Sequence, residues 1–199
     1  VRMGWDYHNN HTFSALDKLG VEVDFSGIPG LYINPKNNEI KSVNFFDWSL
    51  SPNNPYFPSV NDYRRPPNEN EKSLNILEAP NFVSKSILWS LISGAVLAKK
   101  MKDYKQIFRA IKKPVYWIGL TGKTKLFTPV INQLVRELKY KDKLYFITYF
   151  HPDELIPNNS SLYSLQNLHD NLNMLKTVVN HCGADMQFIK AADIRNILV

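Results

Sequence analysis

The chain of 199 residues has one cysteine, Cys182. One cysteine excludes the internal disulfide framework that holds many small secreted domains together. The most apolar stretch, residues 87–98, is shorter than the about 20 residues that a membrane-spanning helix needs, so we expect a core helix there. No secretory signal peptide opens the sequence. We therefore expect a cytoplasmic protein, while a periplasmic or extracellular location stays open because the chain begins at Val1, as if partway through a fold.

The sequence also lacks any concentrated block of charge. Its 24 Lys and Arg residues exceed its 18 Asp and Glu residues, which gives a net charge of +6. The basic residues are scattered, with short clusters only at residues 99–102 and 139–141, as on a solvated surface. No nucleic-acid-binding motif accompanies them. We therefore expect one globular domain over residues 1–199, with no nucleic-acid partner and no membrane span.

Strand and helix patterns alternate along most of the chain. This alternation is typical of an α/β protein with a mainly parallel sheet or barrel. Apolar periodicity and capping residues predict helices at residues 10–20, 84–102, 128–138, 164–182 and 191–198. The helix at 128–138 is expected to begin with Thr128 as N-cap and Pro129 in its first turn. Strands are expected at residues 21–25, 115–118, 144–150 and 186–189.

Residues 31–81 interrupt this alternation with a long stretch rich in aromatic residues, Pro and Asn. Only residues 43–48 and 75–79 in it have strand patterns, and loops of this length are uncommon unless they are functional. Asp47 and Trp48 combine a carboxylate with an aromatic wall, which suits sugar binding. Tyr56, Tyr63 and Arg64 add aromatic faces and directed hydrogen-bond donors. The alternative is a core tryptophan in a loop that is packed by its own aromatic side chains.

The run at residues 144–150 ends in His151-Pro-Asp-Glu154. Chemistry in α/β barrels lies at the C-terminal tips of the strands, and a histidine there is a candidate general acid or base. The alternative is a loop histidine that only ends the strand. Two other motifs are incomplete. Gly122-Lys-Thr lacks the upstream glycine of a phosphate-binding loop, and a metal held by His8 and His11 would need further ligands.

Several segments, taken in order, resemble the polysaccharide deacetylases of the NodB-homology family. Arg2-Met-Gly-Trp, with the expected helix and strand after it, resembles the arginine-containing third motif of that family. Asp47-Trp48 resembles the Asp-Trp of the fourth motif. The stretch from Pro55 to Pro66, followed by residues 76–80, is similar to one seen in many bacterial members. His151-Pro-Asp-Glu154-Leu matches the closing motif, His-Pro-x-Glu-Leu.

The resemblance implies an incomplete (β/α)7 barrel that hydrolyses N-acetyl, and sometimes O-acetyl, groups of carbohydrates in cell-surface polysaccharide metabolism. A divalent metal, commonly zinc, polarises the acetyl carbonyl and activates water in these enzymes. By this resemblance Arg2 would orient the base aspartate and His151 would protonate the leaving amine, steered by Asp47 or Asp24. The residues expected to contact the sugar are Trp48, Tyr56, Tyr63, Arg64 and Glu154.

The sequence departs from the family pattern at the metal. The family's ligands come from a Thr-Phe-Asp-Asp strand and a His-x-x-x-His segment, both on the N-terminal side of the arginine motif, and neither occurs here. We therefore assign no metal ligand, and we expect a C-terminal part without the N-terminal strands. Such a part would be inactive alone and would have an open sheet edge and an uncovered apolar face. The alternatives are a non-catalytic glycan-binding module and a split enzyme completed by a partner segment or chain.

Overall fold

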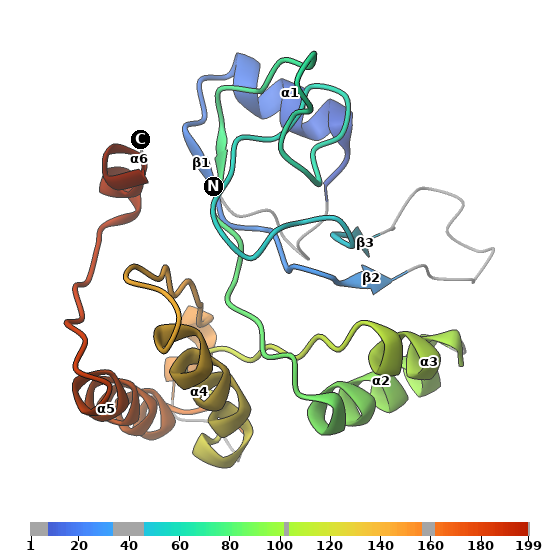
Figure 1. Ribbon diagram of the computed structural model, residues 1–199. Coiled ribbons are helices and arrows are strands. Elements are labelled where there is room, and N and C mark those ends of the chain that lie inside the picture. Colours follow the sequence, from blue (N-terminus) through green and yellow to red (C-terminus); the bar gives the residue numbers. More distant parts are fainter. Residues whose placement is uncertain (1–7, 34–45, 102–103, 157–161, 199) are drawn as a thin grey trace.

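The computed structural model describes residues 8–33, 46–101, 104–156 and 162–198. The upper part of Figure 1 contains helix α1 (Asn10–Lys18) with two small sheets beside it. β1 (Val23–Asp24) pairs in parallel with β4 (Leu77–Glu78), and β2 (Tyr32–Ile33) pairs antiparallel with β3 (Phe46–Asp47). No helix in the described residues is long and apolar enough to cross a membrane.

The lower part of Figure 1 is helical. α2 (Ile87–Met101) and α3 (Lys105–Lys112) form a hairpin on the right, and α4 (Thr124–Leu138) and α5 (Leu165–His181) lie on the left. The short 3-10 helix η2 (Pro152–Leu155) precedes α5. After α5 a single extended segment leads to η3 (Ala191–Asp193) and α6 (Ile194–Leu198), near the upper part of the molecule.

The aromatic stretch after β2 is part of the hydrophobic core. Asn10 on α1 holds it, since its side chain accepts the Tyr63 N–H at 3.0 Å and donates to the Asn61 carbonyl at 2.7 Å. Next to this contact, α1 and the aromatic stretch share one hydrophobic core, which consists of Phe13, Ile28, Leu31, Trp48, Tyr63, Leu74, Ile76 and Val83. Residues 31–81, which interrupt the predicted alternation of strands and helices as a long aromatic insertion loop, therefore contribute three strands and much of this core.

A second core joins α4 to α5. Phe127, Val130, Ile131 and Leu134 of α4 pack there with Leu175 and Val179 of α5. α4 begins at Thr124, not after Thr128, so the predicted N-cap is wrong. Phe127 is fully buried, which holds the additional first turn of the helix against the core. Pro129 is tolerated inside α4, and the Thr128 hydroxyl donates to the Thr124 carbonyl instead of capping the helix.

The run at residues 144–150, predicted as the strongest strand, is not a strand in the structure. Two backbone hydrogen bonds reach it, from Phe82 N–H to the Ile147 carbonyl at 2.7 Å and from Leu120 N–H to the Tyr149 carbonyl at 2.8 Å. Residues 186–189 form no strand either, and residues 115–118 contribute only an isolated bridge from Tyr116 to Ser84. The described residues therefore form two two-stranded sheets and no closed barrel. The incomplete (β/α)7 barrel stays a prediction.

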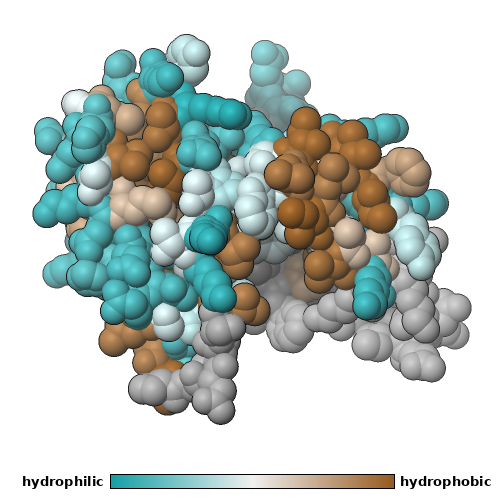
Figure 2. Space-filling view, turned by 90° about the horizontal axis from the view of Figure 1, so that it is seen from below, coloured by the Kyte–Doolittle hydropathy of each residue, from teal (hydrophilic) through white to brown (hydrophobic). Residues whose placement is uncertain are grey.

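The α2–α3 hairpin carries an exposed apolar surface, while the apolar face expected from missing strands stays a prediction. Hydrophobic side chains gather on the right of Figure 2, over the α2–α3 hairpin. Among them, Leu88 and Val96 are 64% and 63% exposed, and Phe108 of α3 is 66% exposed. A monomeric protein seldom exposes a contiguous apolar patch of several hundred Å² without a use for it.

Candidate functional site

His151 is exposed at the point where the extended run after Leu144 turns into η2. Its imidazole lies edge-on to the Tyr149 ring, with ring centroids 5.5 Å apart. Its backbone N–H donates to Oε2 of Glu154 at 3.0 Å, and its carbonyl accepts the Glu154 N–H at 3.0 Å. These two bonds form a tight turn that fixes the backbone of His151 while its ring faces solvent.

Glu154 is in turn fixed by a chain of contacts that reaches back to α5. The Thr121 hydroxyl donates to the same oxygen, Oε2, that receives the His151 N–H. Asn167 of α5 donates to the Thr121 carbonyl at 3.0 Å, and the buried Asn171 donates to the carbonyls of Leu120 and Gly122 at 2.7 Å each. Oε2 of Glu154 thus positions the backbone of His151, and the sugar contact predicted for Glu154 stays a prediction.

Asp47, which is buried, and Arg64, which is partly exposed, form an ion pair through Oδ2 and Nη1. Oδ1 of Asp47 accepts from the Ser49 N–H at 3.0 Å and from the Ser49 hydroxyl at 2.6 Å. Arg64 also donates to Asp62 through Nε at 2.8 Å and Nη2 at 3.0 Å. Both predicted functional groups are thus engaged with protein partners. The hydrogen bond to Asp62 raises the pKa of Arg64, and the negative charges of Asp47 and Asp62 raise it further. Burial acts in the opposite direction but is outweighed.

The three aromatic residues predicted to line a sugar groove lie inside the protein. Trp48 is 0% exposed, and Tyr56 and Tyr63 are each 7% exposed. The Tyr56 hydroxyl donates to the Tyr63 carbonyl at 3.0 Å, and the Tyr63 hydroxyl donates to the Asp47 carbonyl at 2.9 Å. Their ring faces are used for core packing, so the alternative of a self-packed loop describes them better than sugar stacking does.

A buried group of titratable side chains at β1 and β4 was not predicted. Asp24 and Glu78 are register partners on the two parallel strands, and both are fully buried. His8 is also buried, with its Nε2 3.1 Å from Oδ2 of Asp24. Glu78 accepts the Gly27 N–H at 2.8 Å through Oε1, and Oε2 has no hydrogen-bond donor in the described part of the chain. One signal was available, because Glu78 is the sole charged residue in the apolar run Ile76-Leu-Glu-Ala.

The pKa values of the Asp24 and Glu78 carboxyl groups shift in opposite directions. Burial, together with the nearby Asp24 charge, raises the pKa of Glu78 well above its usual value. Burial also acts to raise the pKa of Asp24, but its contacts with His8 and Glu78 outweigh burial and lower that pKa. These pKa shifts favour a protonated Glu78 beside a negatively charged Asp24.

The residues present do not fit a zinc site. No three side chains of His, Cys, Asp or Glu within the described ranges converge on a position where a metal ion could bind. His8 and Asp24 contact each other directly, His11 is exposed on α1, and His151 lies beside an aromatic ring. Arg2, the predicted orienting residue, lies outside the described residues. The described residues are therefore assigned no metal-dependent step.

Comparisons with protein-family models, with curated proteins and with solved structures found no match for the chain. The family resemblance therefore depends on the residues of the chain itself. Of these, the described structure joins Asp47, Tyr63 and Arg64 in one group and His151 and Glu154 in another, where Thr121 and Tyr149 contact them.

Proposed function

We propose that this protein acts in the hydrolytic deacetylation of carbohydrates, removing N-acetyl or O-acetyl groups from sugars. His151 carries this proposal. An imidazole exchanges protons near neutral pH, and this one is exposed on a turn whose backbone is tied to Glu154. It would protonate the leaving amine or alkoxide as the acyl bond breaks. The histidine motif that suggested the family thus has a geometry suited to a general acid.

A nucleophile for the reaction must come from elsewhere. The resemblance implies a divalent metal, commonly zinc in that family, and the described residues do not provide its ligands. A positioned general acid contributes about 10²–10⁴-fold by itself, which does not replace a metal-activated water. We therefore propose that the described residues supply the acid side of the site, and that ligands from another segment or another polypeptide supply the metal side.

One observation favours completion by an additional extended segment. Within the described part of the chain, the backbone N–H groups of residues 144–148 donate to no acceptor. Unpaired N–H groups along an apolar, β-rich run are a template for strand addition. A segment of the full-length gene product or a partner chain would pair there. Size measurement of the chain with and without a candidate partner tests this second proposal.

The proposed activity is tested by acetate release from an N-acetylated oligosaccharide. The full-length gene product is expected to release acetate, and a chelator is expected to abolish the release, with recovery on addition of Zn²⁺. The 199-residue chain alone is expected to release none. Acetate release that continues unchanged under chelation would reject the metal-dependent mechanism.

A further inference from the structure

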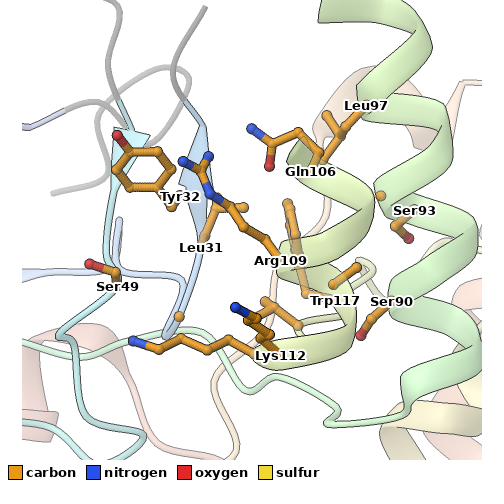
Figure 3. Close-up of a pocket in the computed structure, with 15 residues that line it drawn as sticks. Leu31, Tyr32, Ser49, Ser90, Ser93, Leu97, Gln106, Arg109, Lys112 and Trp117 are labelled. Atoms are coloured by element: carbon orange, nitrogen blue, oxygen red, sulfur yellow. The ribbon is translucent and has the colours of Figure 1, made fainter. Parts of the chain in front are cut away.

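The α2–α3 hairpin and β2 enclose a cavity of about 320 Å³ that no part of the proposed mechanism uses. Figure 3 shows Arg109 extending from α3 across the cavity toward Tyr32 of β2, with Lys112 below it on the same helix. Lys113 also lines the cavity. The volume lies at the lower end of the range found for small-molecule sites, about 300–1,000 Å³.

The helices present matching faces to this cavity. The lining residues of α3 are Gln106, Arg109, Ala110 and Lys112, followed by the C-cap residue Lys113. Gln106, Arg109, Ala110 and Lys113 recur with the spacing of one helical face. The two helices approach closely at Gly94, where an added Cβ would lie 2.9 Å from that of Ala110. This close packing fixes α3 against α2, and with it the backbone from which the Arg109 side chain extends. The cations also lie at the C-terminal end of α3, where the helix dipole stabilises positive charge.

Two polar groups in the cavity have no hydrogen-bond partner among the described residues. The Arg109 guanidinium lies 3.9 Å from the centre of the Tyr32 ring, and its buried Nη1 reaches no acceptor there. The hydroxyl of Ser90, which is 1% exposed, is likewise unpartnered within the described ranges. Buried donors without acceptors are costly, most of all when they carry charge. An oxyanion beside the guanidinium would accept from the unpartnered Nη1 of Arg109.

The positive charge of the cavity lining favours a doubly charged anion over a singly charged one. Arg109, Lys112 and Lys113 contribute three positive charges, and none of the described lining residues is acidic. A phosphate monoester carries close to two negative charges near neutral pH, so it gains more from this lining than a carboxylate does. The remaining wall includes Leu97 and Trp117, which suit an apolar or aromatic body.

We propose that this cavity binds a small-molecule phosphate monoester, with the phosphate at the Arg109 guanidinium and an apolar or aromatic body against Trp117. The ammonium groups of Lys112 and Lys113 add charge at the mouth. A guanidinium fork matches the geometry of a phosphate group. This proposal does not depend on deacetylation, because it uses none of the residues of the His151 turn.

Titration calorimetry of the 199-residue chain with phenyl phosphate tests the proposal. One saturable site is expected, with weaker binding of inorganic phosphate, which lacks the ring, and of benzoate, which carries a single charge. Phenol, the neutral analogue, is expected not to bind. Equal binding of phenol, or tighter binding of benzoate than of phenyl phosphate, would overturn the assignment, as would the absence of binding by phenyl phosphate.

Variants locate the bound phosphate. Arg109→Lys keeps the charge but loses the fork, and it is expected to weaken phenyl phosphate binding by about tenfold. Lys112→Ala removes an exposed charge at the mouth and is expected to weaken binding several-fold. Lys139→Ala removes the same charge from an exposed position outside the cavity and is the matched control. If Lys139→Ala weakens binding as much as Lys112→Ala does, the attraction is general and the cavity is not the site.

Discussion

The buried carboxyl pair at β1 and β4 leads to a specific prediction for Glu78→Gln. Glutamine keeps the size of the side chain, and its carbonyl oxygen can still accept the Gly27 N–H now bound by Glu78 at 2.8 Å. Its amide group can donate to Asp24, as the proton on Glu78 does in our interpretation. The substitution therefore preserves the contacts and removes only the ability to ionise.

The expected effect follows from the direction of the pKa shift. The pKa of Glu78 is raised on folding by burial and by the Asp24 charge. The folded state then holds a proton that the unfolded state releases above the ordinary glutamate pKa of 4.5. Between that value and the raised folded pKa, the wild-type free energy of unfolding falls by about 1.4 kcal/mol per pH unit from this group alone. This contribution is fully present below pH 4.5 and is lost as the pH rises through the folded pKa.

Urea unfolding at a series of pH values from about 5 to about 7 measures this slope. The curve of Glu78→Gln is expected to be flatter than the wild-type curve, with the variant gaining stability relative to wild type as the pH rises. Glu71→Gln is the control, because the Arg65 ion pair lowers the pKa of Glu71 and its titration falls below this window. That variant is expected to run parallel to wild type. If Glu78→Gln also runs parallel to wild type, Glu78 is not protonated in the folded state and the reasoning is refuted.

Three further substitutions test other parts of the structure. Trp48→Ala is expected to lower the free energy of unfolding by about 3–5 kcal/mol, since the indole is fully buried. A variant as stable as wild type would show that the indole is not part of the core. Gly94→Ala is expected to lower the melting temperature, because the new Cβ meets Ala110 at 2.9 Å and overpacking costs about 1–3 kcal/mol. Glu154→Ala is expected to lower kcat of the full-length gene product more than it changes KM, because Glu154 positions His151; an effect on KM alone would show a direct sugar contact instead.

Helices were predictable from the sequence because their signals are local. The helix at residues 10–20 was predicted from its apolar spacing and from Gly20, and α1 ends before that glycine, which has a φ of 74°. The helix ended by Gly183 behaves in the same way, with a φ of 71°. Capping and glycine geometry act within a few residues, so a single sequence contains the information.

Strands were less predictable because each needs a neighbour. Residues 144–150 have a strong β pattern, but a regular ladder requires a second backbone, and the sequence pattern cannot show whether one is present. The few hydrogen bonds that reach Ile147 and Tyr149 do not form a strand.

The candidate site was only partly predictable, because some of its features follow from local sequence and others from tertiary packing. The position of His151 in a turn after an extended run was apparent from its neighbours. The burial of Trp48 and Tyr63 was not, because the same residue types line grooves and fill cores. The cavity at Arg109 was missed, since it forms only when α2 and α3 pack against β2.

The most direct test of the proposed function is the rate of acetate release by the full-length gene product and its His151→Ala variant. His151 is exposed, so the substitution is expected to leave stability near the wild-type value. Loss of the general acid is expected to slow acetate release by about 10²–10⁴-fold. A variant that releases acetate at the wild-type rate would show that His151 takes no part in the chemistry.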